Sequence, residues 1–429
     1  MTINRAKYNS TTTIESDLTN PVSVFYIPNN NSPGIDAFGR LRVSTPKSFF
    51  QTTAISDQHR TLFWSSKIVQ SASWTHLSAT ATCTMLISGT VGDYVAYQTK
   101  PYMHYEAGNS LLVYETFNFS GSSAGIHKKV GYFDDKDGYY LELSGGCLNI
   151  VERTSVPTGG NLIAETRISQ SNWNLDRFDG SGPTGANFNI SGASFLSLDF
   201  EWLGVGSVRM ALMDDNGEFR YIHRFDHANV FTQPYIRTPN LPLCVEISAS
   251  QTVASKQGME FYCATVKIEN GSESSKHIER SKSRGISLLA TGQNFMPIMQ
   301  VRLKDNEHTQ VIIDSVNIAC DNASAVFEWS LNYNPTFNGI GTGSLWTSVV
   351  SSSIEYDIIM SQSLSDEGIK LAGGYGLSRT GDITVIGKDF VPLTIDINGN
   401  KDIISLLTRR VDSNTSANFY GSISWKEYL

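Results

Sequence analysis

The 429-residue chain has little charge and no long apolar run. Only 17% of its residues are charged, against about 25% in an average soluble domain. Its 41 acidic residues outnumber its 33 basic residues and give a formal charge of -8, which argues against a general attraction to nucleic acid or anionic lipid. No segment approaches the roughly 20 apolar residues that a membrane-spanning helix needs. We therefore expect neither nucleic acid nor a membrane as a partner.

Cysteine is also scarce, and its spacing shows no pairing. The five cysteines are odd in number, lie far apart and form no C-x-x-C pair. This pattern predicts buried free thiols in a reducing compartment and argues against a disulfide framework or a zinc site. The five residues are Cys83, Cys147, Cys244, Cys263 and Cys320.

Signals for export and for common enzyme classes are missing as well. Residues 1–7 are not followed by an apolar segment, so we expect no Sec-type signal peptide and a chain that stays where it is made. The sequence has neither a G-x-S-x-G elbow nor a Walker-type phosphate loop. We expect no enzyme activity, no catalytic residue and no cofactor. The two carboxylates of a glycosidase would leave no recognisable spacing, so a depolymerase stays open.

The chain is instead rich in segments whose apolar residues occupy every second position. Leu196, Leu198 and Phe200 alternate with polar residues, which places the apolar side chains on one face of a strand. The pair at 216–217, Asn-Gly, predicts a tight hairpin turn. We therefore predict a mostly β protein of antiparallel β-sandwich or jelly-roll domains with an extended N-terminal arm. The same alternation recurs at 139–143, 208–212, 299–303 and 354–358.

Helical spacing has one good candidate. Asp402 can cap the start of a helix, and Ile403, Ile404, Leu406 and Leu407 would then lie on one side of it. We expect a short helix here, which does not change the fold class.

Composition divides the chain into four parts. Residues 1–48 are polar and contain four prolines, which predicts an extended arm that does not fold alone. Residues 49–265 are predicted to form the first sandwich, and residues 266–285 form a polar, exposed connection. A second strand-rich domain is expected at 286–429.

Two local patterns could be mistaken for metal sites. His223 and His227, with Asp226 beside the second, have the i, i+4 spacing that binds a metal only on a helix, whereas the preceding residues alternate like a strand. Hydrogen-bonded structural histidines are the expected outcome. The loop at 134–138, Asp-Asp-Lys-Asp-Gly, lacks the downstream Glu of an EF-hand and is predicted to be a solvated turn. We expect no metal site.

Several segments in order and in spacing carry a family resemblance: DAFGRLRVS at 36–44, DFEWLGVGSVR at 199–209, HAN at 227–229, TPNLPLCVE at 238–246 and NPT at 334–336. Together they resemble a family of virion structural proteins of tailed bacteriophages, with relatives in large DNA viruses. The resemblance implies a particle component, located in the virion after synthesis in the host cytoplasm. Its partners would be copies of itself and other virion proteins, on the outside of a capsid or a tail. The resemblance supplies no catalytic residue.

The first of these motifs contains the candidate assembly arm. In an extended chain Arg40 and Arg42 lie on one side, while Leu41 and Val43 lie on the other. Such a segment can add to the sheet edge of a neighbour, with backbone hydrogen bonds for affinity and alternate side chains for specificity. We hypothesise that these four residues and Phe38 latch onto an adjacent subunit.

The second motif also has a physical interpretation. Gly204 and Gly206 lie between two alternating segments, where glycine permits a bend and a close approach of the backbone. Arg209 lies on the opposite side of its strand from Val208 and Met210. We therefore expect Arg209 on a polar face or beside an acidic partner.

The alternative function is recognition of a host-surface glycan. Sandwich loops can carry binding sites, and the 18 Tyr and 7 Trp residues can stack on sugar rings where they are exposed. Most of these aromatic residues lie in alternating segments, where packing in a core or between subunits is the simpler account. Assembly is therefore the first function hypothesis, and glycan binding is the second.

Overall fold

The computed structural model describes residues 36, 42, 46–55, 60–157, 162–269, 277–284, 287–290, 294–305, 309–322, 324–338, 346–358, 364–377, 382–385 and 392–428. In this part nearly all regular structure is antiparallel strand, beside a four-residue helix α1 (Arg60–Phe63) and a 3-10 turn η1 (Gln170–Asn172). The prediction of a mostly β fold is confirmed. No helix among these residues is long and apolar enough to cross a membrane.

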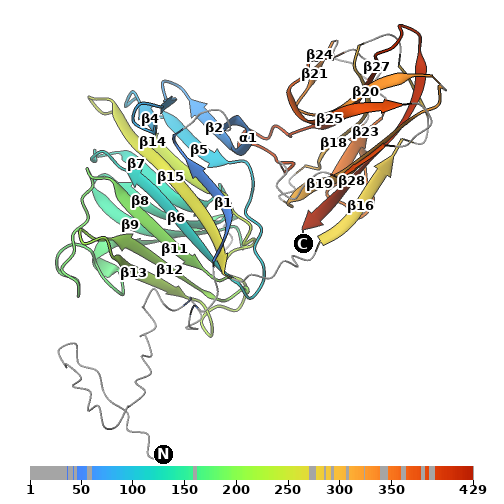
Figure 1. The fold of residues 1–429 in the computed structure, drawn as a ribbon. Helices are drawn as coiled ribbons and strands as arrows, with labels where there is room; N and C mark the ends of the chain where they lie inside the picture. Colours follow the sequence, from blue (N-terminus) through green and yellow to red (C-terminus); the bar gives the residue numbers. More distant parts are fainter. Residues whose placement is uncertain are drawn as a thin grey trace, which may run out of the picture.

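The first domain, residues 46–269, consists of two sheets packed face to face (Figure 1). Eight strands form one sheet in the order β13-β12-β11-β6-β15-β4-β3, with β1 also paired to β15. Their bounds are β1 (Lys47–Thr53), β3 (Ser73–Leu77), β4 (Thr82–Ile87), β6 (Ser110–Asn118), β11 (Ser194–Phe200), β12 (Ser207–Met213), β13 (Phe219–Asp226) and β15 (Gln257–Glu269).

The other sheet of this domain has seven strands in the order β10-β9-β8-β7-β14-β5-β2. One cluster of buried apolar side chains draws on both sheets and forms the core. The strand bounds are β2 (Trp64–Val69), β5 (Tyr94–Thr99), β7 (Ile126–Phe133), β8 (Gly138–Ser144), β9 (Cys147–Thr154), β10 (Ala164–Ser169) and β14 (Leu243–Ala249).

The second domain, described between residues 277 and 428, also has two main sheets and a core of its own. One sheet has the order β16-β28-β19-β26 with β17 beside β28; the other has the order β22-β23-β18-β27-β20-β25. The bounds are β16 (His277–Ser283), β17 (Leu288–Ala290), β18 (Met296–Leu303), β19 (Val311–Cys320), β20 (Val326–Tyr333), β22 (Thr347–Ser348), β23 (Ile354–Asp357), β25 (Ile369–Leu377), β26 (Asp382–Val385), β27 (Ile404–Arg410) and β28 (Ala417–Tyr428), with a small pair of β21 (Thr336–Phe337) and β24 (Leu364–Asp366).

Alternation and turn chemistry place the strands as the sequence predicts. In β11 Leu196, Leu198 and Phe200 are buried in the core. Gly217 turns the chain between β12 and β13 with φ +78°. Gly206 packs so tightly that an added Cβ would lie 2.0 Å from the Glu201 carbonyl oxygen. This confirms the predicted close approach of the backbone in the second motif.

The prediction of a short helix after Asp402 is wrong. Residues from Ile404 onward form β27, a strand between β18 and β20. Ile404 and Leu406 face the core, and Leu407 is buried on the other face. A strand covered on both faces has a continuous apolar run, which periodicity alone does not separate from a buried helix.

Two further predictions can be compared with the structure only in part. Strand β15 continues to Glu269 and β16 already begins at His277, so part of the predicted connection at 266–285 is strand. Of the candidate assembly arm, Arg42 is described, whereas Phe38, Arg40, Leu41 and Val43 lie outside the described residues.

All five cysteines are free, as predicted. Cys83, Cys244 and Cys320 are buried and Cys263 is half-buried, but Cys147 is exposed. Cys147 begins β9 directly after the turn that follows β8, where solvent reaches its side chain. The prediction of burial is therefore wrong for this one thiol.

Candidate functional site

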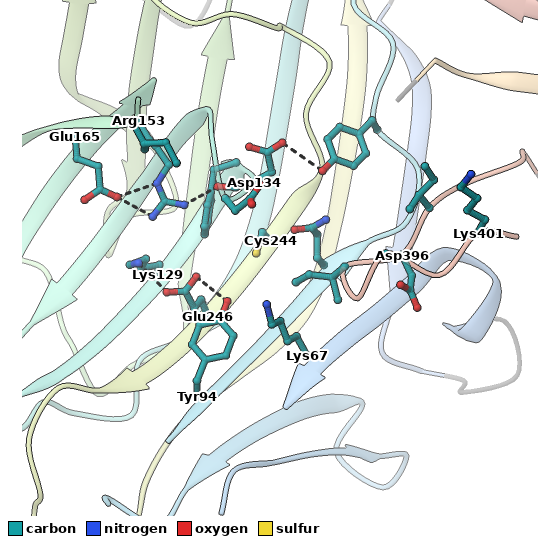
Figure 2. A pocket seen from close by; sticks show the side chains of 18 of the residues that line it. Lys67, Tyr94, Lys129, Asp134, Arg153, Glu165, Cys244, Glu246, Asp396 and Lys401 are labelled. Atoms are coloured by element: carbon teal, nitrogen blue, oxygen red, sulfur yellow. Dashed lines mark hydrogen bonds and ion pairs between the residues drawn. The ribbon is translucent and has the colours of Figure 1, made fainter. Parts of the chain in front are cut away.

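A cleft of about 620 Å³ lies where the outer face of the seven-stranded sheet meets the second domain (Figure 2). Strands β2, β5, β7, β9, β10 and β14 each contribute side chains to its wall. Asp305 and residues from the loop at 395–401 contribute from the second domain. Its volume falls within the roughly 300–1,000 Å³ of small-molecule sites in proteins.

The loop at 395–401 holds the two domains together beside this cleft. The backbone N–H of Ile397 donates to the Ser65 hydroxyl at 3.2 Å, and the Asn398 side chain donates to the Ser66 carbonyl at 3.0 Å. Both serines belong to β2 of the first domain. The second domain therefore closes one side of a surface that the first domain presents.

An ion pair next to this loop adds to the domain contact. Lys100 Nζ lies 3.2 Å from the Asp402 carboxylate and above the Tyr333 ring. The Asn334 side chain donates to the same carboxylate oxygen at 2.8 Å. Leu62, from the short helix α1, packs against the core of the second domain.

Glu246 on β14 is the centre of one hydrogen-bonded group in the cleft (Figure 2). It accepts from Lys129 Nζ at 2.7 Å and from the Tyr94 hydroxyl at 3.3 Å. Burial raises the pKa of Tyr94, and the neighbouring Glu246 charge raises it further. Tyr94 is therefore a neutral phenol that donates its proton to Glu246 and keeps its oxygen lone pairs as acceptors.

Arg153 on β9 is the centre of a second group. Its guanidinium contacts Glu165 at 2.8 Å and donates to the Asp134 carbonyl at 2.5 Å. Burial alone would raise the pKa of Glu165, but the charge of Arg153 together with hydrogen bonds from Tyr140 and Arg153 and the charge of Arg167 lowers the pKa to about 2. The guanidinium also lies above the rings of Phe133 and Tyr140. Glu165 is thus ionised and Arg153 is held on several sides.

The acidic turn at 134–138 is not the solvated turn that the sequence predicts. Asp134 is 5% exposed and Asp137 is fully buried. The Asp134 carboxylate accepts from the backbone N–H groups of Lys136 and Asp137 and from the Tyr102 hydroxyl, at 2.7–3.2 Å. Burial raises the pKa of Asp134. Packing of the turn against the cleft wall, which local sequence does not encode, converts it into a structural element.

Two polar side chains on the wall have no protein partner in the described part of the chain. Gln98 on β5 is 5% exposed, and its side-chain amide makes no hydrogen bond there. Lys67 on β2 is exposed and forms no ion pair there. Cys244 also lines the cleft, but burial raises the pKa of its thiol well above the ordinary value, so it is not an activated nucleophile. The polar groups of this wall suit binding better than covalent chemistry.

The first two family-like motifs meet on the outer face of the eight-stranded sheet. Arg42 lies 2.5 Å from the Asp199 carboxylate and 2.6 Å from Glu269. Asp199 also accepts from Arg209 Nε at 3.1 Å and from the Ser110 hydroxyl at 2.7 Å. The expected acidic partner of Arg209 is thereby confirmed. These two partners of Arg42 lie in the first domain, and the inter-subunit latch stays a hypothesis about the arm.

Both histidines of the spacing considered above are hydrogen-bonded, as expected of structural residues. His223 accepts from the backbone N–H of Asn174 at 3.1 Å, and burial lowers its pKa to about 4. His227 contacts Glu152 at 2.7 Å and the Gly206 carbonyl at 2.6 Å. Over the ranges that the structure describes, no group of three or more His, Cys, Asp or Glu side chains is arranged to hold a metal ion.

Among the residues of this cleft, sequence reasoning singled out the 134–138 turn, Cys244 as a buried thiol, and the motif at 238–246 that contains Cys244 and Glu246, but it assigned none of them to a site. The other lining residues come from separate strands and from a loop about 300 residues further along the chain. One signal was present: Glu246 alternates with the core residues Val245 and Ile247 in an otherwise buried strand. A charged residue at an outward position of a buried strand indicates that another surface covers it.

Comparison with known proteins finds only distant structural likenesses. No protein-family model and no curated protein match the chain. Among solved structures it is similar to the Emp46p carbohydrate recognition domain (10% identity, 52% of this chain and 97% of that one, TM-score 0.31). Peanut lectin (11%, 52% and 98%, 0.29) and a glycosyl hydrolase family protein from Mycobacterium fortuitum (9%, 51% and 99%, 0.34) are similar to the same extent. At this level of similarity no function is transferred.

Proposed function

We propose that the chain is a structural subunit of a bacteriophage particle, placed on the outside of a capsid or tail. Copies of the chain would contact one another and other virion proteins. Two things support the proposal: the resemblance carried by the motifs, and an edge strand of the second domain that is suited to pairing with another chain. The edge strand is the structural observation that carries it.

That strand is β25, at the edge of the six-stranded sheet (Figure 1). It has nine residues, of which only Lys370 is charged, and no proline. Tyr375 is 69% exposed and Ile369 is 42% exposed. No strand among the described residues pairs with β25 on the side away from β20. Natural edge strands usually carry charges, prolines or bulges that prevent pairing. In β25 the charge of Lys370 and a β-bulge between Lys370 and Ala372 protect the first part of the strand, but residues 373–377 carry neither.

A second copy of β25 fits this edge. Antiparallel pairing about a two-fold axis uses the same edge of both copies and closes into a dimer. The charge on Lys370 is already compensated by Glu328, 3.1 Å away. Because Lys370 lies near one end of the strand, an antiparallel arrangement centred near Tyr375 keeps the two lysines far apart.

The oligomeric state tests this contact. The full chain should form a dimer or larger oligomer by light scattering coupled to size exclusion, and Tyr375→Lys should shift it toward the monomer by placing two charges in the new sheet. Ile55→Lys is the matched control, because Ile55 is 69% exposed and lies in the first domain. A monomeric wild type, or an equal effect of both substitutions, would refute pairing through β25.

Location is tested independently on purified virions. Immunogold labelling on the capsid or on the tail, with the chain present in the particle's mass spectrum, would support the particle subunit. Absence from both would overturn it.

The second candidate function is recognition of a host-surface glycan. The observation in its favour is the cleft between the domains, whose walls carry neutral phenols, an unpartnered amide and fixed ion pairs. A glycan array probed with the full chain tests it, and absence of any binding by the assembled chain would count against it.

A further inference from the structure

We propose that the cleft between the two domains binds a neutral carbohydrate, with Gln98 as its central polar contact. The inference deepens the second candidate function and rests on it. It names the site, the residues and the charge class of the ligand.

The side chain of Gln98 is the strongest indication of a ligand. It is 95% buried by protein, yet its amide has no hydrogen-bond partner among the described residues and lines the cleft. Its polar atoms are not among the fully buried ones, so the cleft gives water or a ligand access to the amide. An amide offers both donors and an acceptor, which is the pattern that a sugar hydroxyl requires.

The neighbours of Gln98 extend this polar surface in a fixed geometry. Tyr94 is on the same strand and donates to Glu246, so its oxygen can accept a hydrogen bond from a ligand. Glu246 is held by Lys129, and Arg153 is held by Glu165. Side chains locked by such partners lose little freedom when a ligand binds, which favours affinity.

The charges of the wall select against an anionic ligand. Six carboxylates and four cationic side chains line the cleft. Three of the four cations already have carboxylate partners: Lys129 with Glu246, Arg153 with Glu165, and Lys401 with Asp305. A phosphate or an acidic sugar would meet an excess of negative charge, whereas a neutral sugar would not.

Apolar side chains in the cleft provide a second kind of contact for a sugar. Ile163 is 46% exposed at the first-domain side of the cleft, and Ile395 and Ile397 line it from the second domain. Sugars present C–H groups on their ring faces and hydroxyls on their edges. A wall that carries both polar groups and isoleucines can contact both.

The test is binding of the full chain to an array of neutral, amino and acidic glycans, followed by titration of the best ligand by calorimetry. Gln98→Leu removes the amide and keeps the side-chain size, so we expect at least about a tenfold loss of affinity for one lost buried hydrogen bond. Lys67→Ala should also weaken binding. Lys256→Ala is the matched control, because Lys256 is exposed and outside the cleft.

Each outcome separates this inference from the proposals above. Binding of neutral glycans that is weakened by Gln98→Leu and unchanged by Lys256→Ala supports the site. Glycan binding that Gln98→Leu leaves unchanged, in a variant with wild-type thermal stability, refutes the cleft but leaves glycan recognition standing. Preference for acidic or amino glycans refutes the charge argument. No binding at all overturns both, while the proposal of a particle subunit stands on the virion experiments.

Discussion

An unpaired carboxyl group in the core of the first domain leads to a sharp prediction about stability. Glu115 lies on β6 between Leu196 of β11 and Ala264 of β15, and it faces the same side as the core residues Val113 and Phe117. It is 1% exposed, and neither carboxylate oxygen has a hydrogen-bond partner. Burial raises its pKa well above the ordinary value of 4.5. The group therefore costs free energy in the folded state.

Replacing Glu115 by methionine should stabilise the protein. An unsatisfied buried polar group costs about 1–3 kcal/mol, whereas a volume-conserving change in a core costs less than about 1.5 kcal/mol. We expect Glu115→Met to raise the free energy of unfolding by about 1–2 kcal/mol near pH 4.5 and by more at neutral pH, where ionisation of the unfolded wild type adds to the difference. Glu115→Gln keeps unsatisfied polar atoms and should give a smaller gain, so it serves as the control for charge alone.

The pH dependence gives the prediction a second signature. Because the folded pKa of Glu115 lies above the unfolded value, the folded state binds more protons than the unfolded state between the two values. The wild type therefore compares best with the variants below about pH 4.5. As the pH rises from there toward the folded pKa, its free energy of unfolding falls by up to about 1.4 kcal/mol per pH unit. Neither Met nor Gln at this position titrates, so both variants should lack this loss.

Urea unfolding followed by tryptophan fluorescence at pH 4.5, 6 and 8 measures both effects. The difference between Glu115→Met and wild type should widen from pH 4.5 to pH 8. A variant that is less stable than wild type at every pH, or a difference that stays constant with pH, would show that Glu115 is satisfied in solution and that the reasoning is wrong.

Two more substitutions test the structural interpretation of the second motif. Asp199→Asn leaves the buried guanidinium of Arg209 without its carboxylate and should lower the free energy of unfolding in urea by about 3–5 kcal/mol. The control, Asp226→Asn, removes a partly exposed ion pair and should cost less than about 1 kcal/mol. Equal costs would contradict the buried network. Gly206→Ala places a Cβ against the Glu201 carbonyl and should abolish or strongly reduce the yield of folded protein. In the control, Gly108→Ala, the added Cβ meets open space, so only the positive φ should lower the free energy of unfolding, by roughly 1–2 kcal/mol. Thermal unfolding measures both.

The strand content of this fold could be predicted because half-buried strands show the period of two directly. Leu196, Leu198 and Phe200 identify β11, and the Asn216-Gly217 pair identifies its neighbouring hairpin. The method fails where both faces of a strand are covered. In β27 only Ser405, itself buried, interrupts the apolar run from Ile404 to Leu407, and a nearby Asp made the segment resemble a capped helix.

The candidate site was largely beyond sequence reasoning because it depends on long-range packing. Gln98 and Lys401 are about 300 residues apart, and no spacing rule connects them. The turn at 134–138 was recognised as a turn, but its burial depends on contacts with Tyr102 and Arg153. An acidic partner for Arg209 could be predicted from the sequence. The period of two places this arginine on the face opposite the core, where a charged side chain needs a partner, and that partner is Asp199.

The loop at 395–401 links ligand binding to the arrangement of the two domains. The same loop lines the cleft and donates hydrogen bonds to Ser65 and Ser66 on β2. A ligand that contacts both walls binds the closed arrangement better than an open one, and by thermodynamic linkage it must stabilise the domain contact by the same free energy. The edge strand β25 belongs to the second domain, so its direction relative to the first domain depends on this contact. If both proposals hold, a ligand in the cleft would favour one direction of β25 relative to the first domain, although the two sites share no residue.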